Sequence, residues 1–335
     1  MSNEIEIDER LAELFKKFSA SSVASIQSIS SHGSERKIFR LTSKDFSCIG
    51  IDNANLDENK AFINFAGHFR KHGLNVPQVF LSSDDLNFYL LEDLGDTTLF
   101  TFIEQNRNDF PDNVLPFYQT ALTDLINFQF ESCKGIDYSL CYQFSEFGKE
   151  NIEFDINYFK EKFLKEFVKD FDASVLDSDF EFLTSKILEL PRKYFLYRDF
   201  QSRNIMVREG KLHYIDFQSG RKGAILYDVA SLLFDAKADL PNSSREELLG
   251  YYLKNVSGKY DLNQKEYENY FWYFVMIRIL QALGAYGNLG IIKGKKQFLE
   301  SIPLALKNIR YVLNEKIKPE ELVKLRILFN ERINN

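Results

Sequence analysis

Residues 194–219 read YFLYRDFQSRNIMVREGKLHYIDFQS. The order of apolar and polar residues predicts a strand, then a polar loop, then two strands that form a hairpin. Asn204 follows Asp199 after a gap of four residues, and Asp216 comes directly after the last strand. The apolar residues of the hairpin are expected to hold the loop rigidly, so that the three polar side chains face one pocket.

This layout predicts a site for phosphoryl transfer. The protein-kinase loop H-R-D-x-x-x-x-N and its D-F-G segment have the same spacing, with Tyr197 here in place of His and Gln218 in place of Gly. Asp199 is placed to take a hydroxyl proton, while Asn204 and Asp216 offer Mg²⁺ hard oxygen ligands. A lone D-x-x-x-x-N would also fit an ordinary hairpin with exposed carboxylates. The order of features elsewhere in the chain favours the catalytic interpretation.

Composition limits the class of protein. The 335 residues are enough for two lobes, and the net charge of −7 predicts no nucleic-acid partner. The three cysteines lack metal-ligand spacing and suit a reducing cytoplasm. The acidic N-terminus is unlike a signal peptide. The most apolar segment, 270–283, is interrupted by Arg278 and Gln281, so no membrane span is expected.

The first part of the chain alternates like strands, with one helix at the start and one in the middle. Strands are expected at 23–29, 37–41, 46–51, 76–80 and 88–91, and helices at 7–18 and 58–72. Asp57 can cap the second helix. The polar turn 30–36 contains Ser34 and Arg36. It can cover nucleotide phosphates through its backbone N–H groups and Ser34, and an ordinary hairpin turn fits these residues equally well.

A kinase carries a phosphate-binding lysine on its third strand, and this chain has none at 46–51. Arg36, Lys37 or Arg40 on the neighbouring hairpin can supply the cation instead. Glu58 stands where a kinase helix offers a carboxylate to that lysine. A solvated glutamate in the first helical turn is the other interpretation of Glu58. His68 and His72 of the same helix are expected to be surface residues rather than metal ligands.

An apolar strand runs into the acidic, glycine-containing segment 91–96, which predicts a hinge between two lobes. Backbone groups of Glu92, Asp93 and Leu94 are expected to hydrogen-bond adenine. The sequence therefore predicts an N-terminal nucleotide-binding lobe over 1–95 and a C-terminal catalytic and substrate-binding lobe over 96–335.

The rest of the chain has mainly helical periodicity. The clearest helices are expected at 117–130, 156–171, 267–286, 301–314 and 320–330, with another that begins near Ser243 or Ser244 in a capping box. Asp155, Glu161 and Glu166 are expected on solvated helix faces. Asp228 can cap a helix, hold the catalytic loop through its backbone, or do both. The helix with Trp272, Arg278 and Gln281 either lines an acceptor pocket or is an aromatic core helix.

These features together resemble the aminoglycoside phosphotransferase/choline kinase family. The resemblance rests on LEDLGD at 91–96, RDFQSRNIM at 198–206, IDFQ at 215–218 and YDVASLL at 227–233. Within the family, the R-D-F-x-x-R-N-x-M loop, the glutamine after Phe217 and the segment RILQALG at 278–284 are most similar to bacterial anomeric kinases of N-acetylmuramate and N-acetylglucosamine.

The resemblance implies an α+β, protein-kinase-like fold with a small antiparallel-sheet lobe and a larger, mostly helical lobe. It implies ATP and Mg²⁺ as cofactors, Asp199 as base, and Asn204 and Asp216 as metal ligands. The acceptor would be the C1 hydroxyl of a small-molecule sugar, and the sugar 1-phosphate would feed cell-wall recycling. An aminoglycoside or choline phosphotransferase and a nucleotide-binding pseudokinase that acts through a partner are the alternatives. The sequence favours no particular oligomeric state.

Overall fold

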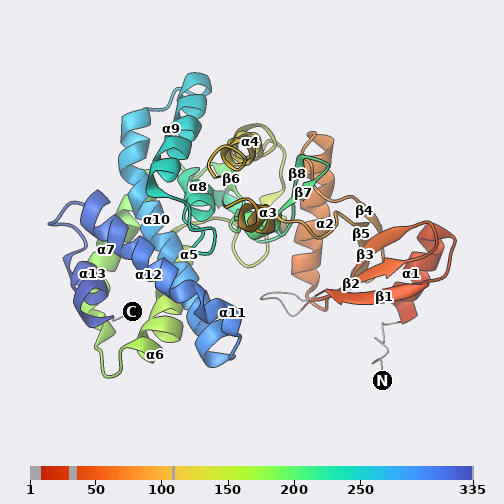
Figure 1. Ribbon diagram of the computed structural model, residues 1–335, viewed down its shortest axis with the longest axis horizontal. Helices are drawn as coiled ribbons and strands as arrows, with labels where there is room; N and C mark the ends of the chain where they lie inside the picture. The colour runs from red at the N-terminus through yellow and green to blue at the C-terminus, as the bar shows by residue number, and fades with distance from the viewer. Residues whose placement is uncertain (1–8, 30–35, 108–109, 334–335) are drawn as a thin grey trace.

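An antiparallel sheet forms the N-terminal part of the protein. The computed structural model describes residues 9–29, 36–107 and 110–333, and Figure 1 shows the sheet at one end and a large group of helices at the other. The strands occur in the order β1-β2-β3-β5-β4, all antiparallel. Their bounds are β1 Ser25–Ile29, β2 Lys37–Thr42, β3 Ser47–Asp52, β4 Val79–Ser82 and β5 Phe88–Glu92. The predicted strands are confirmed to within about three residues at each end.

The two sides of this sheet are covered differently. Helix α1 (Glu9–Ser19) packs on one side, where Leu11, Leu14 and Phe15 join Phe39 and Leu41 of β2 in a small core. Helix α2 (Leu56–Lys71) lies toward the rest of the molecule, and its buried phenylalanines belong to the large core that continues into the helical part.

The start of α2 differs from the prediction. The capping residue is Asn55, whose side chain accepts a hydrogen bond from the N–H of Glu58 at 3.2 Å. Asp57 instead lies in the first turn, where its charge favours the helix dipole. The helix therefore begins two residues earlier than expected, and Glu58 lies in its first turn.

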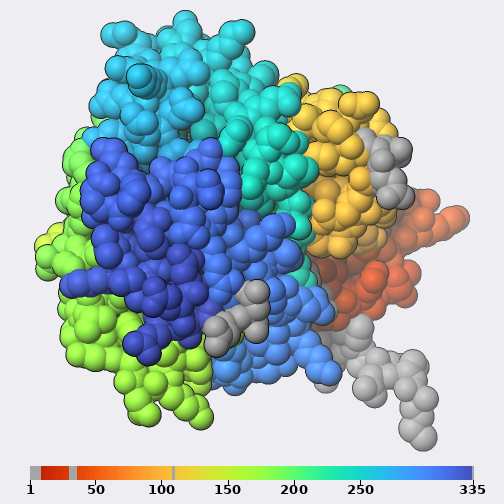
Figure 2. Space-filling view, turned by 60° about the vertical axis from the view of Figure 1, so that its left-hand side comes forward, coloured from red at the N-terminus to blue at the C-terminus, as the bar shows by residue number. Residues whose placement is uncertain are grey.

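Helices make up most of the second part. Their bounds are α3 Leu99–Gln105, α4 Leu115–Ile126, α5 Lys149–Phe159, α6 Lys165–Phe167, α7 Asp177–Glu189, α8 Leu226–Leu233, α9 Asn242–Lys259, α10 Gln264–Tyr286, α11 Lys296–Leu299, α12 Ser301–Tyr311 and α13 Val323–Ile327. Figure 2 shows the C-terminal helices, in blue, covering the side of this part that lies away from the sheet. A sheet-bearing lobe and a larger helical lobe confirm the predicted fold class.

Three predictions about helices are wrong. The helix expected at 156–171 begins seven residues earlier, at Lys149, and its helical run ends at Phe167. Helix α9 begins after Pro241 and has no side-chain cap, so Ser243 and Ser244 lie in its first turn instead of forming a capping box. Asp155, expected in solvent, is 1% exposed. It lies on the buried stripe of α5 and has a buried partner, described below.

Helix α10 is the central helix of the second part. Together with its continuation to Ile292 it is long and apolar enough to cross a membrane, although the sequence predicted no such segment. Within the most apolar window, 67% of the residues are buried inside the protein. Its contacts with α5, α8 and α12 make it a core helix.

Two short antiparallel strand pairs position the polar residues of the segment 194–219. Strand β6 (Tyr194–Leu196) pairs with β9 (Arg221–Gly223), and β7 (Ile205–Arg208) forms a hairpin with β8 (Lys211–Tyr214). The loop that carries Asp199 connects β6 to β7, and Asp216 follows β8. Both residues therefore lie in connections between the two strand pairs.

Candidate active site

The backbone of the Asp199 loop is held by a buried carboxylate. Asp228, in the first turn of α8, accepts hydrogen bonds from the N–H groups of Tyr197 at 2.7 Å and Arg198 at 2.9 Å. These bonds confirm that Asp228 holds the loop, whereas α8 has no side-chain cap. Arg198 has a φ of +83°, a strained conformation for a residue with a side chain. The turn at Arg198 thus sets the direction of the next residue, Asp199, which lines a cavity described below.

Tyr197 braces the loop from the other side. Its hydroxyl donates to the carbonyl oxygen of Ile215 at 2.6 Å, and its side chain is fully buried. The bond ties the Asp199 loop to the residue before Asp216. Tyrosine thus provides at this position the bracing expected of the kinase histidine.

The structure brings the three predicted catalytic and metal-binding residues together. The Nδ2 of Asn204 donates to the backbone oxygen of Asp199 at 2.9 Å and to Oδ2 of Asp216 at 3.3 Å. Asp216 has a φ of +69°, so the backbone turns sharply there. Both bonds use the amide nitrogen, and no hydrogen bond within the described residues uses the Oδ1 of Asn204.

Arg36 connects this cluster to α2. Its Nη2 lies 2.5 Å from Oδ1 of Asp216, and its Nε lies 3.5 Å from Oε1 of Glu58. Gln218 lies on the same cluster and donates to Asp216 at 2.9 Å. Burial alone would raise the pKa of Asp216, but the Arg36 guanidinium and Gln218 hold it below its usual value. Of the three candidate cations, Arg36 is thus the one that the structure places beside both carboxylates.

The other two candidates have different roles. Lys37 is exposed and pairs with Asp52 at 3.2 Å. Arg40 forms a fork with the Asp93 carboxylate, at 2.8 and 3.1 Å, and Ser47 donates to the same carboxylate at 2.6 Å. Arg40 therefore ties the predicted hinge to the sheet.

In the predicted hinge, the side chains form ion pairs with neighbouring segments, while part of the backbone forms no hydrogen bond within the described residues. Glu92 contacts Arg70 at 3.6 Å and Arg208 at 3.3 Å. Within the described residues, neither the N–H nor the C=O of Leu94 forms a hydrogen bond, although the residue is 6% exposed. Buried backbone groups nearly always form hydrogen bonds. The N–H and C=O of Leu94 would therefore suit a ligand that both donates and accepts hydrogen bonds, such as adenine.

Ser34, the remaining predicted nucleotide contact, lies outside the described residues. His68 is partly buried, and its Nε2 donates to the carbonyl oxygen of Ser132 at 2.7 Å. Among the described residues there is no group of three His, Cys, Asp or Glu side chains that could hold a metal ion. Two oxygen donors, Asn204 and Asp216, still fit Mg²⁺, which keeps several waters and takes further oxygens from phosphates.

The Asp199 carboxylate points at a cavity of about 160 Å³. Aromatic and polar side chains line it: Gln143, Phe144, Asn151, Phe154, Asp155, Tyr158, Arg198, Asp199, Ser219, Arg221 and Gln281. No hydrogen bond or ion pair within the described part of the chain occupies this carboxylate. Burial raises the pKa of Asp199, although the nearby Arg278 acts in the opposite direction. A carboxylate with a raised pKa is a better proton acceptor.

Sequence reasoning missed most of this cavity. Arg198 forms a fork with the Asp155 carboxylate, at 2.8 and 2.6 Å, and both side chains are buried. Of the late helix, Gln281 reaches the cavity, and Arg278 donates to Gln281 at 2.7 Å. Trp272 packs on Phe234 and Phe271 instead, as an aromatic core residue does.

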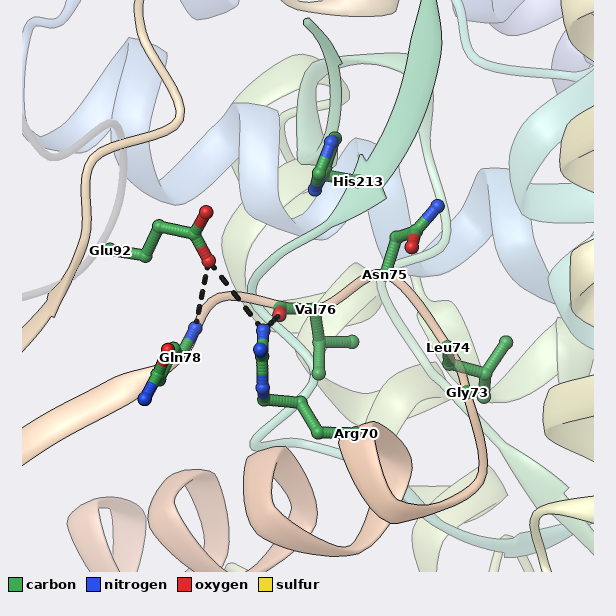
Figure 3. Close-up of a pocket in the computed structure, with 8 residues that line it drawn as sticks. All are labelled: Arg70, Gly73, Leu74, Asn75, Val76, Gln78, Glu92 and His213. Carbon is green, nitrogen blue, oxygen red and sulfur yellow. Dashed lines mark hydrogen bonds and ion pairs between the residues drawn. The ribbon is translucent and has the colours of Figure 1, made fainter.

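A larger cavity, of about 360 Å³, lies behind the hinge (Figure 3). The end of α2, the segment 73–78, Glu92 and His213 line it. The Glu92 carboxylate there accepts from the N–H of Gln78 at 3.2 Å and faces the Arg70 guanidinium. Asp199, Asn204 and Asp216 are absent from its lining, so the smaller cavity is the one placed for chemistry.

Comparisons with known proteins agree with this geometry. The model of the phosphotransferase enzyme family, APH, matches residues 25–262. A protein of Neisseria meningitidis serogroup B named N-acetylmuramate/N-acetylglucosamine kinase is 28% identical over 288 residues, which are 83% of this chain and 82% of that protein. A protein of Pseudomonas aeruginosa with the same name is 25% identical over 329 residues, 95% of this chain and 92% of that protein.

Among solved structures, an amicoumacin kinase in complex with AMP-PNP and Ca²⁺ is similar with a TM-score of 0.62. It is 12% identical, and the match covers 90% of this chain and 91% of that chain. At this identity the likeness shows the fold, which is the kinase-like fold that the sequence predicted.

Proposed function

The chain belongs to the phosphotransferase enzyme family, and we propose that it transfers the γ-phosphoryl group of ATP to a sugar hydroxyl. The proposed acceptor is the anomeric hydroxyl of N-acetylmuramate or N-acetylglucosamine, the sugars in the names of both relatives. The products would be the sugar 1-phosphate and ADP, and the place of the reaction would be cell-wall recycling in the cytoplasm.

The cavity beside Asp199 carries this proposal. Phe144, Phe154 and Tyr158 form an aromatic wall, and Phe154 is 50% exposed at its edge. The C–H face of a sugar ring packs on such a wall, and the hydroxyl groups need polar partners such as Gln143 and Gln281 around it. A mixed lining of this kind fits a sugar of the size of one ring.

The charges of the cavity do not favour cationic acceptors. Its lining holds two guanidinium groups, Arg198 and Arg221, and two carboxylates, Asp155 and Asp199, and Asp155 is paired with Arg198. The lining therefore has no excess of negative charge with which to attract an aminoglycoside or choline. This balance gives no electrostatic advantage to the cationic substrates of the wider family.

The residues have defined roles in the proposed reaction. Asp199 accepts the proton of the acceptor hydroxyl. The hydroxyl oxygen forms a bond to the γ-phosphorus, while the bond between the γ-phosphorus and the oxygen of the leaving ADP breaks. Asn204 and Asp216 would hold Mg²⁺, which neutralises charge on the phosphates when bound. Arg36 supplies a cation at the same phosphates, and the backbone of Glu92–Leu94 takes adenine between the lobes that meet at 95–96.

A pseudokinase remains the second candidate because the strand-three lysine is missing and Tyr197 replaces the histidine. Arg36 and the hydrogen bond from Tyr197 to Ile215 argue against it, since each fulfils the role of the residue that is lacking.

Coupled ADP release from the purified protein, with ATP and Mg²⁺, tests the proposal. N-acetylmuramate, N-acetylglucosamine, kanamycin and choline are the acceptors, and Asp199→Asn is assayed alongside. We expect turnover with an amino sugar and a loss of about 10²–10⁴-fold in the variant. No turnover with any sugar, while ATP still raises the melting temperature, would favour the pseudokinase. An Asp199→Asn variant as active as wild type would refute the assignment of the base.

A further inference from the structure

Arg221, at the start of β9, is a buried cation that forms no ion pair with a carboxylate of the described residues. It is 2% exposed, and no described carboxylate forms an ion pair with it. Its Nε donates to the backbone oxygen of Ser219 at 2.9 Å, and its Nη1 donates to Oδ1 of Asn151 at 2.5 Å. Both acceptors are neutral. A buried charge is costly unless an opposite charge compensates it, so the site calls for an anion.

The two carboxylates whose charges act on Arg221, those of Asp155 and Asp199, form no ion pair with it in the described part of the chain. Asp155 uses both of its oxygens in the fork with Arg198. Arg198 also adds a second positive charge, and burial together with this charge lowers the pKa of Arg221 to about 10. A positively charged side chain that is destabilised in this way gains from an anionic ligand.

The free side of Arg221 faces the cavity. Its Nη2 forms no hydrogen bond within the described part of the chain, and the residue lines the cavity together with Asp199. The guanidinium also lies 5.5 Å from the centre of the Phe144 ring, on the aromatic wall. A ring-sized ligand with one hydroxyl at Asp199 therefore has its substituents within the same small space as Arg221.

We propose that Arg221 forms a subsite for a carboxylate carried by the acceptor sugar. This inference rests on the proposed function and narrows it: the preferred substrate is an acidic N-acetylated amino sugar, and its neutral counterpart is a poorer one. N-acetylmuramate has such a carboxylate on its lactyl ether, and N-acetylglucosamine lacks it.

The test measures kcat/KM for both sugars in four proteins: wild type, Arg221→Gln, Arg221→Lys and Lys222→Gln. Lys222 is the matched control, because it is the next residue of β9, carries the same charge, is exposed and does not line the cavity. We expect Arg221→Gln to lose roughly 10- to 100-fold on N-acetylmuramate and little on N-acetylglucosamine. Arg221→Lys should fall between, since it keeps the charge without the fork. Lys222→Gln should behave as wild type.

The same subsite can be tested on the substrate side, without any variant. The methyl ester of N-acetylmuramate keeps the shape of the sugar and removes its charge, and wild-type kcat/KM should fall roughly 10- to 100-fold with the ester. An equal loss on both sugars in Arg221→Gln would overturn the inference, because it would assign Arg221 to the transferred phosphoryl group. An ester as good as the acid would also overturn it.

Failure of the proposed function gives a different result. If wild type releases no ADP with either sugar, the kinase assignment to amino sugars fails. Calorimetric titration of the wild-type protein with N-acetylmuramate and with its methyl ester then decides on the subsite alone. Tighter binding of the acid, lost in Arg221→Gln, supports the subsite, and equal binding or no binding of the two compounds refutes it.

Discussion

Replacing Arg36 by glutamine should weaken both folding and the use of ATP. The side chain is 12% exposed, and its partners Glu58 and Asp216 are 13% and 31% exposed. Breaking a buried ion pair by removing one partner costs about 3–5 kcal/mol. Because solvent partly screens Asp216, we expect the free energy of unfolding to fall by about 2–3 kcal/mol. Urea unfolding of the two proteins measures this difference.

The catalytic effect should be larger. Arg36 is the cation that the structure places between the α2 carboxylate and the metal-binding segment, so its loss removes charge stabilisation from the phosphates. We expect kcat/KM for ATP to fall about 10²–10³-fold, as for the loss of one preorganised donor. Initial rates of coupled ADP release over a range of ATP concentrations, at saturating sugar, give this value.

Two further variants make the result interpretable. Lys37→Gln removes the same charge one residue away, where the side chain is 70% exposed, and should change stability by at most about 1 kcal/mol. Arg36→Lys should recover part of the activity, because a single ammonium cannot bridge two carboxylates as a guanidinium does. If Arg36→Gln had the same kcat/KM for ATP as Lys37→Gln, Arg36 would have no part in nucleotide use. Its position beside Asp216 would then not indicate a role at the phosphates.

Three other substitutions test the site. Tyr197→Phe removes the only hydroxyl that reaches Ile215 in the described structure, and should cost about 1–3 kcal/mol in urea unfolding with a lower kcat. Asp155→Asn breaks the buried pair with Arg198 and should cost about 3–5 kcal/mol, while unchanged stability would mean that the pair contributes nothing net. Asn204→Ala should raise the Mg²⁺ concentration needed for half-maximal ADP release about 10-fold or more, and an unchanged Mg²⁺ titration would remove Asn204 from the metal site.

The local part of the site could be predicted from the sequence because short segments fix it. Asp199, Asn204 and Asp216 lie on one hairpin and the loop before it, and the pairing of β7 with β8 leaves little freedom in where they meet. Their spacing alone therefore predicted their proximity. The sequence left the role of Asp228 open between a helix cap and a hold on the loop, and the structure shows the bonds to the loop without a cap.

The sequence left three candidates for the cation that is proposed to bind the phosphates, and it could not decide between them. Strand alternation puts Arg40 on the face of β2 opposite to Phe39 and Leu41, and its direction along the strand leads it to the hinge. Arg36 precedes the strand at its other end, near α2. The decisive contact joins residues that are 180 positions apart, and only the packing of α2 against the segment after β8 brings them together.

The burial of Asp155 was detectable in the sequence. Residues Ile152, Ile156 and Phe159 form the buried stripe of α5, and position 155 is three residues after the first of them and four before the last. A helix places such positions on one face, so the charge belonged to the interior. A buried charge needs a partner of opposite charge. Here the partner of Asp155 is Arg198, the residue before the predicted base Asp199.

The cations of the site lie in two groups. Arg36 comes from the sheet lobe and lies beside Glu58 and Asp216, whereas Arg198 follows β6, Arg221 begins β9, and both line the cavity beside Asp199. Asp199 lines the same cavity as the second group, and no hydrogen bond or ion pair of the described residues uses its carboxylate. An acceptor site for cations is expected to carry an excess of carboxylates, whereas this lining holds two carboxylates and two guanidinium groups. On the proposed assignments, a change at Arg221 would alter the choice of acceptor without touching the residues proposed to bind the nucleotide.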